Sequence, residues 1–285
     1  MAPKAMSDIK FFNVTFPAPF VAHVEINRPQ KLNAFYEPMW LELKTIFEKL
    51  SPDPDVRCIL ISGAGDRAFT AGLDVQEASK SGSPLGTAAP TRDPSRQATS
   101  LRRHIFELQD VISAVARCEK PTIALLHGYT FGLGIDLSSA CDIRFAESDT
   151  KFSVKEVDIG LAADVGTLSR LPKVVGGITS WVKEVTLTAR PFTAEEALQN
   201  RFVSRVVKGK ANLISEGLEY AKFVASKSPV AVQGTKNILD AAWGRTVEDN
   251  LNYTAAWNAA MVQSSDVSRA MLSGLQKRTP TFEKL

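Results

Sequence analysis

The sequence lacks the features from which several classes of protein and site are built. No apolar run reaches the roughly 18 residues of a membrane span, and no G-K-[ST] phosphate loop is present. Among the 285 residues only three are cysteines, Cys58, Cys118 and Cys141. They are far apart and lie in apolar contexts, without the paired spacing of a zinc site or a disulfide framework. We expect reduced core thiols in an intracellular compartment.

Charge and histidine content exclude further functions. The formal net charge is +3 and the sequence pI is about 8.7, which is too mild to indicate nucleic acid as a partner, and no Lys/Arg block with interleaved aromatics occurs. The histidines His23, His104 and His127 share no ligand or triad spacing. The sequence therefore predicts neither a metal site nor a histidine-based nucleophilic triad.

Strand-like and helix-like segments alternate through the first two thirds of the chain. Residues 11–16 and 20–28 are typical of an antiparallel strand pair, and residues 36–50 have the apolar spacing of a helix. Further segments with strand or helix patterns are 56–65, 101–120, 121–129, 131–140 and 141–147. The alternation favours an α/β architecture.

Two regions interrupt or follow this core. Residues 79–100 are rich in Ser, Gly, Pro, Thr and Ala and are expected to form a mobile loop within a core of residues 1–206. Residues 207–285 have helical spacing throughout. The expected role of Trp243, Trp257 and Met261 is core packing, and the alternative is a contact between subunits, for which we expect the region 207–285 to serve.

Three carboxylates stand in an otherwise apolar, glycine-bearing run, residues 153–172. Glu156, Asp158 and Asp164 have no basic residue between the first and the last of them. An unpaired buried carboxylate costs several kcal/mol or shifts its pKa until it is neutral. Two interpretations stay open: the residues are solvated, with Asp164 capping a following helix, or some of them line a cleft.

Glycine turns follow two of the predicted strands, in residues 61–75 and 126–137. Each turn exposes backbone amides, and the second opens a helix, where the dipole favours negative charge. The second turn has Leu137 where a dinucleotide motif would have its third glycine, so nicotinamide chemistry is not indicated. Two convergent amides can instead stabilise the oxygen of a thioester as it becomes an enolate, each donor being worth about 3 kcal/mol in comparable sites.

With these motifs, the sequence resembles the crotonase superfamily, the enoyl-CoA hydratase and isomerase fold. Residues 24–35 are similar to the family's first strand and turn, residues 62–75 to its first oxyanion loop, and residues 128–161 to its second. Residues 171–176 and 188–207 follow in family order. The resemblance implies an α/β fold with a spiral of repeated β-β-α units and a helical C-terminal region.

Within that family, the run 154–176 is similar to the delta-3,5-delta-2,4-dienoyl-CoA isomerases, because hydratases usually have a glycine at the position of Asp164. The resemblance implies that Asp136, Glu156 and Asp164 are catalytic, and it leaves Asp158 at the surface. It also implies an oxyanion hole in which the amides of Leu73 and Leu133 are the donors, Leu133 standing where the family usually has glycine. The residues expected to form this hole and bind substrate are Ala71, Gly72, Leu73, Asp74 and Leu133.

The implied reaction converts a 3,5-dienoyl-CoA into a 2,4-dienoyl-CoA in fatty-acid β-oxidation. A proton is lost at C2 and another is gained at C6, too far apart for one short carboxylate, so Glu156 is the expected base, Asp164 the expected acid, and Asp136 tunes the pair. CoA is part of the substrate, and no separate cofactor or metal is expected. The alternatives are a delta-3-delta-2-enoyl-CoA isomerase, an enoyl-CoA hydratase, and a non-catalytic CoA- or RNA-binding scaffold.

Assembly and location complete the expectations. The resemblance implies a homotrimer or a hexamer. The final residues 283–285, Glu-Lys-Leu, resemble the peroxisomal S-K-L signal. We therefore expect a peroxisomal protein, with the mitochondrion as the alternative, and no partner beyond the acyl-CoA and further copies of the chain.

Overall fold

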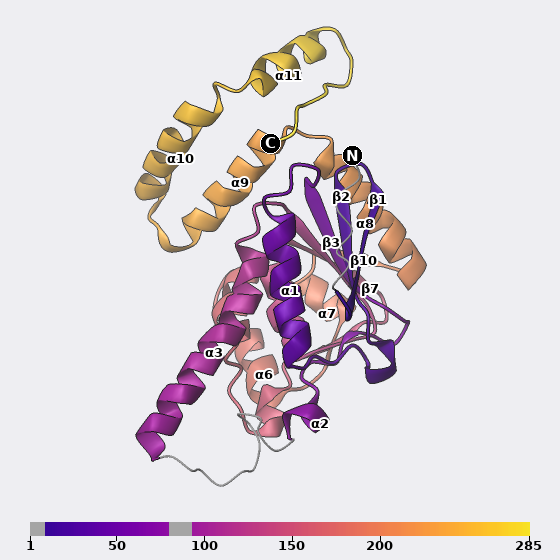
Figure 1. The fold of residues 1–285 in the computed structure, drawn as a ribbon, viewed down its shortest axis with the longest axis vertical. Coiled ribbons are helices and arrows are strands. Elements are labelled where there is room, and N and C mark those ends of the chain that lie inside the picture. Colours follow the sequence, from indigo (N-terminus) through magenta and orange to yellow (C-terminus); the bar gives the residue numbers. More distant parts are fainter. Residues whose placement is uncertain (1–8, 80–92) are drawn as a thin grey trace.

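The computed structural model describes residues 9–79 and 93–285, and in this part of the chain the strands form two sheets (Figure 1). The larger sheet contains, in spatial order, β1 (Phe12–Ala18), β2 (Val21–Ile26), β3 (Cys58–Gly63), β5 (Thr122–Leu126), β7 (Ile143–Glu147) and β10 (Arg205–Val207). The smaller sheet contains β4 (Ala68–Thr70), β6 (Tyr129–Phe131), β8 (Lys151–Ser153) and β9 (Phe192–Thr193).

The chain moves repeatedly from the larger sheet to the smaller one and then into a helix. Strand β3 leads to β4, then α2 (Val75–Ala78) and α3 (Pro94–Ala116); β5 leads to β6 and α4 (Leu133–Ala140); and β7 leads to β8 and the 3-10 turn η2 (Glu156–Ile159). Strands β2, β3, β5, β7 and β10 run parallel, whereas β1 is antiparallel to β2. The predicted α/β spiral of β-β-α units and the antiparallel N-terminal pair are both confirmed.

Both faces of the larger sheet are buried, as its parallel strands require. Helix α8 (Lys210–Ala225) covers one face, where Leu60 and Leu125 belong to a buried cluster. Gly217 lets α8 approach closely, since a Cβ at this position would lie 2.6 Å from a methyl carbon of Leu125. Helices α1 (Glu37–Leu50), α3 and α4 lie over the other face. All three cysteines are buried and free, as predicted.

Helix α3 begins earlier than the sequence predicted, so residues 94–100 are helical and do not belong to a loop. The Asp93 side chain accepts from the amides of Ser95 and Arg96, both at 3.1 Å, and Pro94 occupies the first helical position. An aspartate cap followed by proline is a strong start signal, which here overrides the Ser- and Thr-rich composition. The rest of the expected mobile loop, residues 80–92, lies outside the described residues.

The expected helical region 207–285 consists of α8, which packs on the sheet, and three helices that extend beyond it at the top of Figure 1. These are α9 (Pro229–Ala241), α10 (Val247–Met261) and α11 (Ser265–Leu275), here called the arm. Arg57 binds the chain just before and just after the arm, because its guanidinium donates to Ala225 O, at the end of α8, at 3.3 Å and to Phe282 O, beyond α11, at 2.8 Å. No helix among the described residues is long and apolar enough to cross a bilayer.

The aromatic and methionine side chains of the arm do not all pack as predicted. Trp257 lies against Gly234, where a Cβ would come within 2.8 Å of its indole nitrogen. Trp243 and Met261 remain 49% and 38% exposed. The prediction of core packing within the chain is therefore wrong for Trp243 and Met261. Helices α9 and α10 pack mainly on each other and leave their outer faces uncovered.

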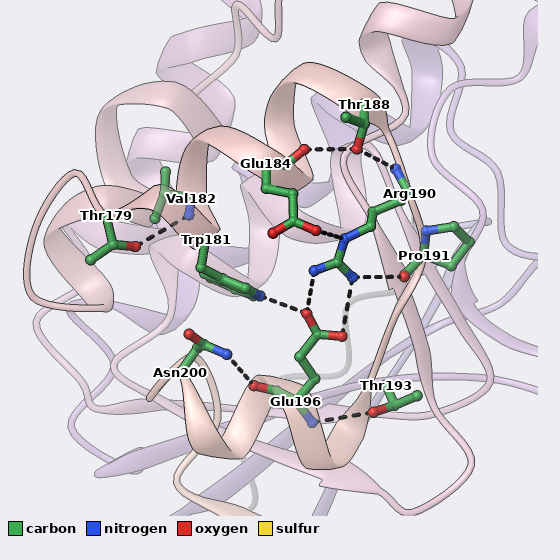
Figure 2. A network of polar contacts seen from close by, with 10 residues as sticks. All are labelled: Thr179, Trp181, Val182, Glu184, Thr188, Arg190, Pro191, Thr193, Glu196 and Asn200. Carbon is green, nitrogen blue, oxygen red and sulfur yellow. Dashed lines mark hydrogen bonds and ion pairs between the residues drawn. The ribbon is translucent and has the colours of Figure 1, made fainter.

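A polar network centred on Arg190 fixes the segments on both sides of β9, the last strand of the smaller sheet (Figure 2). Arg190 joins α6 (Ser180–Thr188) to α7 (Ala194–Gln199): its guanidinium donates to Glu184 at 2.6 Å and to both oxygens of Glu196 at 2.6 and 3.1 Å. The neighbouring Ala189 carbonyl accepts from the Ser153 hydroxyl at 2.6 Å. The network thus supports β8, the strand that leads into Glu156.

Candidate active site

The two glycine turns predicted from the sequence lie against each other. A Cβ on Gly72 would be 3.0 Å from Phe131 O and 3.6 Å from the amide nitrogen of Leu133. A Cβ on Gly132 would be 3.9 Å from the Gly72 α-carbon, and Gly132 has a φ of 51°, a conformation that favours glycine. The first residues after both turns, Leu73 and Leu133, are thereby brought side by side.

The amides of Leu73 and Leu133 have no acceptor within the described part of the chain. A bridge with Phe35 fixes the first turn, because Phe35 N donates to Gly72 O and Asp74 N donates to Phe35 O, both at 2.8 Å. Leu133 is the first residue of α4, so its amide is one of those a helix leaves unpaired and lies at the positive end of the dipole. Two donors without an acceptor in the described part of the chain therefore lie on neighbouring turns, and an oxyanion hole is built from donors of this kind.

Leu133 stands where the family resemblance leads us to expect a glycine. A leucine still has a backbone amide, so the expected hydrogen-bond donor is present. The Leu133 side chain is only 4% exposed and packs in the main hydrophobic cluster. The first oxyanion loop is held by its own polar groups: Ala71 N donates to Leu32 O at 2.9 Å, and the Asp74 carboxylate binds Arg28 at 2.7 Å. The Asp74 carboxylate therefore maintains the shape of the loop.

Glu156 lies beside the second turn, at the start of η2. A Cβ on Gly132 would be 3.0 Å from Glu156 Oε1, and the other oxygen, Oε2, is buried without a hydrogen-bond partner among the described residues. Burial raises the pKa of Glu156 to about 7, and the charges of Asp136 and Asp164 add to the shift. A carboxylate with this pKa exchanges protons efficiently near neutral pH.

Asp136, on α4, is 2% exposed and faces the start of α5 (Thr167–Val174). Its Oδ1 accepts from the Thr167 amide at 2.5 Å and from the Thr167 hydroxyl at 2.8 Å. Burial raises the pKa of Asp136 to about 6, although the Thr167 bonds and the charge of Arg170 oppose the shift. Asp136 thus supplies the acceptor for the first amide of α5. The expectation that Asp164 caps α5 is wrong, because the cap residue is Gly166.

Asp164 is exposed in the single chain, at one end of a cavity of about 1100 Å³ between α5 and α9. Its charge raises the pKa of both Asp136 and Glu156, so the three carboxylates form one electrostatic cluster. The cavity does not reach Glu156 or the two free amides. Asp158 is separate, since it is exposed and paired with Lys155 at 2.8 Å, as expected for a surface residue.

Several residues around the cluster were not found from the sequence. Thr167 and Arg170 lie in α5. Their position in the first turn and the next residues after Gly166, close to Asp164 in the sequence, is the signal that could have marked them as neighbours of the carboxylates. Gln109 and Ser113, on α3, also approach the cluster. They are more than 50 residues away in the chain, and no local pattern links them to Asp164.

Comparisons with known proteins identify relatives of this chain. The enoyl-CoA hydratase/isomerase family profile matches residues 19–284. The chain is 42% identical over 290 residues to the "Delta(3,5)-Delta(2,4)-dienoyl-CoA isomerase, mitochondrial" of Mus musculus, covering 100% of this chain and 86% of that protein. It is 40% identical to the peroxisomal enzyme of the same name from Arabidopsis thaliana, with 93% of each chain covered.

A similar structure is the putative enoyl-CoA hydratase from Streptomyces coelicolor A3(2). The two structures align with a TM-score of 0.86 and 26% sequence identity, over 99% of this chain and 98% of the other. The similarity extends through the arm as well as the core, because almost the whole of both chains is covered.

Proposed function

The chain belongs to the enoyl-CoA hydratase/isomerase family, and from this premise we propose that it isomerises 3,5-dienoyl-CoA to 2,4-dienoyl-CoA. The relatives from Mus musculus and Arabidopsis thaliana bear the name of this activity. The observation that carries the proposal is the buried oxygen of Glu156 beside the Gly132 turn, which has no hydrogen-bond partner in residues 9–79 and 93–285, with the second carboxylate, Asp164, in the same cluster.

In the proposed mechanism the thioester oxygen accepts from the amides of Leu73 and Leu133. Glu156 removes a proton from C2, and the electron pair moves into the thioester to give a dienolate. Asp164 then donates a proton to C6 as the double bonds shift into conjugation with the carbonyl. Asp136 remains bound to Thr167, and its charge favours the protonated form of Glu156 after the first transfer.

An absorbance assay for diene conjugation tests the proposal directly. Purified protein should convert a 3,5-dienoyl-CoA to the conjugated product, with slower turnover of a 3-enoyl-CoA and little addition of water to a 2-enoyl-CoA. Hydration as the faster reaction would contradict the proposal and support a hydratase.

Hydratase chemistry would require two carboxylates to hold one water molecule, and Asp136 with Glu156 is the available pair. The bonds of Asp136 to Thr167 occupy Oδ1 twice and disfavour that arrangement. A non-catalytic scaffold is the remaining alternative. It would lack turnover on all three substrates, whether or not a CoA thioester raised the melting temperature by binding the folded state.

We further propose that the chain assembles as a homotrimer or hexamer through the arm. Large apolar side chains of the arm are exposed, which a monomer rarely tolerates over a continuous region. These side chains are Leu239, Trp243, Val247, Leu251, Met261, Val262, Val267, Met271, Leu272 and Leu275. Light scattering should give a mass of three or six chains, and a stable monomer of 31.0 kDa would contradict the proposal.

We propose that the protein works in one of the two organelles that appear in the relatives' names, the peroxisome or the mitochondrion. Immunostaining of the untagged protein, with a marker for each organelle, tests this. A diffuse cytosolic signal would contradict it.

A further inference from the structure

Side chains from three helices hold the turn that carries Asp164. Gln109 on α3 donates its Nε2 to Asp164 O at 2.6 Å. Asp136 on α4 accepts the Thr167 amide at 2.5 Å, and Arg170 on α5 makes a long contact of 3.5 Å to Val165 O. The backbone on each side of the Asp164 side chain is thus fixed from outside the turn, and the Asp164 carboxylate has no salt bridge among the described residues.

Arg170 occupies a space that exists because residue 166 is glycine. A Cβ on Gly166 would lie 2.0 Å from Arg170 Nη1 and 3.7 Å from Asp136 Oδ1. On its other side, Arg170 Nη2 donates to the Ser113 hydroxyl at 2.9 Å, and this hydroxyl donates to Gln109 O at 2.6 Å. The guanidinium therefore lies between the Asp164 turn, Asp136 and the face of α3 that carries Gln109.

Arg170 is also the cation of the carboxylate cluster. Its charge lowers the pKa of Asp136, against the larger effect of burial, and neither Glu156 nor Asp164 forms an ion pair in the described part of the chain. The charged groups that face Arg170 are Asp136 on α4 and Arg117 at the end of α3. Removing the Arg170 charge therefore raises the pKa of Asp136 further.

We propose that Gln109 and Arg170 are positioning residues: both hold the Asp164 turn where it can deliver a proton to C6, and Arg170 is in addition the counter-charge of Asp136. The inference rests on the proposed function, since it assigns a role within the C6 step. The groups expected to act at C2, which are Glu156 and the amides of Leu73 and Leu133, lie outside the Asp164 turn. Loosening this turn therefore affects one half of the reaction.

The first test separates the two halves. Gln109→Leu removes the donor to Asp164 O while keeping side-chain size. Because a misplacement of about 1 Å can cost on the order of 10²-fold, we expect isomerisation of a 3,5-dienoyl-CoA to fall about 10- to 100-fold. Exchange of the C2 hydrogens with deuterated water, measured by mass spectrometry on the same substrate, should stay within about twofold of the unaltered protein.

The second test separates charge from position at Arg170. Arg170→Met should shift the acid limb of the pH profile for C2 exchange to lower pH, because Asp136 loses its counter-charge, holds its proton to higher pH and, while protonated, no longer raises the pKa of Glu156. Arg170→Lys should restore that limb, but it should not restore isomerisation, since one ammonium cannot bond both Val165 O and Ser113. Ser113→Ala, which changes no charge, should lower isomerisation and leave the limb in place.

Arg190→Met is the matched control. Arg190 forms more ion pairs than Arg170, with Glu184 and Glu196, but it faces none of the three carboxylates of the cluster. It should lower the melting temperature and change neither the pH limb nor the ratio of exchange to isomerisation. Equal losses of both activities in Gln109→Leu, or an unmoved limb in Arg170→Met, would overturn the inference. Absence of isomerisation and exchange in the unaltered protein would instead reject the proposed function itself. If Arg170→Met does not fold, Arg170→Lys, Ser113→Ala and Gln109→Leu still decide the positioning role.

Discussion

Glu196 and Glu156 show how differently two glutamates of one chain are used. Both oxygens of Glu196 accept from Arg190, and one also accepts from the Trp181 indole at 2.7 Å (Figure 2). These bonds, those of Arg190 foremost, lower the pKa of Glu196. Glu156 has a buried oxygen that no group in the described part of the chain bonds, and burial raises the pKa of Glu156 to about 7.

The arginines differ in the same way. Arg190 gives its guanidinium to two carboxylates, whereas Arg170 gives one nitrogen to a serine hydroxyl and acts on Asp136 through its charge. A carboxylate that is fully bonded stabilises its surroundings and cannot take a proton readily. A buried carboxylate with few hydrogen-bond partners destabilises the fold, but its raised pKa lets it exchange protons near neutral pH. Perturbed pKa values are therefore frequent at functional sites.

The largest predicted effect comes from Glu156→Gln, which keeps the shape and removes the base. Isomerisation and C2 exchange should both fall by about 10²–10⁴-fold, the usual contribution of a general base. Glu196→Gln is the matched control and should keep both activities near normal. If Glu196→Gln were as damaging as Glu156→Gln, the distinction between the two glutamates would be wrong.

Gly132→Ala should cause the second-largest loss of activity, after Glu156→Gln. At a φ of 51° the new Cβ would be strained and would lie 3.0 Å from Glu156 Oε1, so it should disturb both the base and the free amide of Leu133. Loss of one oxyanion donor costs about 10²–10³-fold in kcat, and we expect a loss of at least about 10²-fold. Gly244→Ala, where a Cβ meets nothing within 4 Å, should be nearly neutral in the same assay.

The pH dependence should show a smaller, graded effect. Because Glu156 must be ionised to take a proton and its pKa is raised to about 7, kcat/KM should fall about tenfold per unit below that pH. Asp136→Asn keeps an acceptor for Thr167 and removes a charge that raises the pKa of Glu156, so the limb should move to lower pH. A limb that stays in place would show that Asp136 does not tune Glu156.

The free energy of unfolding should change in opposite directions when Glu156 and Arg190 are replaced. The folded pKa of Glu156 is raised above its ordinary value of 4.5, so its contribution to stability is present below about pH 4.5 and is lost as the pH rises through about 7. Glu156→Gln should therefore stabilise the fold by on the order of 2 kcal/mol at pH 8 and little at pH 4. Arg190→Met should destabilise it by about 1 kcal/mol or less, since exposed ion pairs contribute little. Urea unfolding at both pH values measures each change.

Local patterns in the sequence were sufficient for β1, β2, β3, β5 and β7, the two glycine turns and the carboxylate run, but they did not predict the short strands of the smaller sheet. They failed where a distant element decides the structure. Asp164 looked able to cap α5 because it precedes the helix, but Asp136, from another helix, supplies the acceptor. Gln109 bonds Asp164 O across 55 residues. Trp243 looked suited to a core that the single chain does not provide.

The central claim is that two carboxylates divide the proton transfer between C2 and C6. Asp164→Asn tests it most directly when diene conjugation and C2 deuterium exchange are measured on the same 3,5-dienoyl-CoA. We expect conjugation to fall by at least about 10²-fold while C2 exchange persists, because Glu156 can still form the dienolate and return the proton to C2. Near-normal conjugation by Asp164→Asn would contradict the claim and indicate an isomerase that works with one carboxylate.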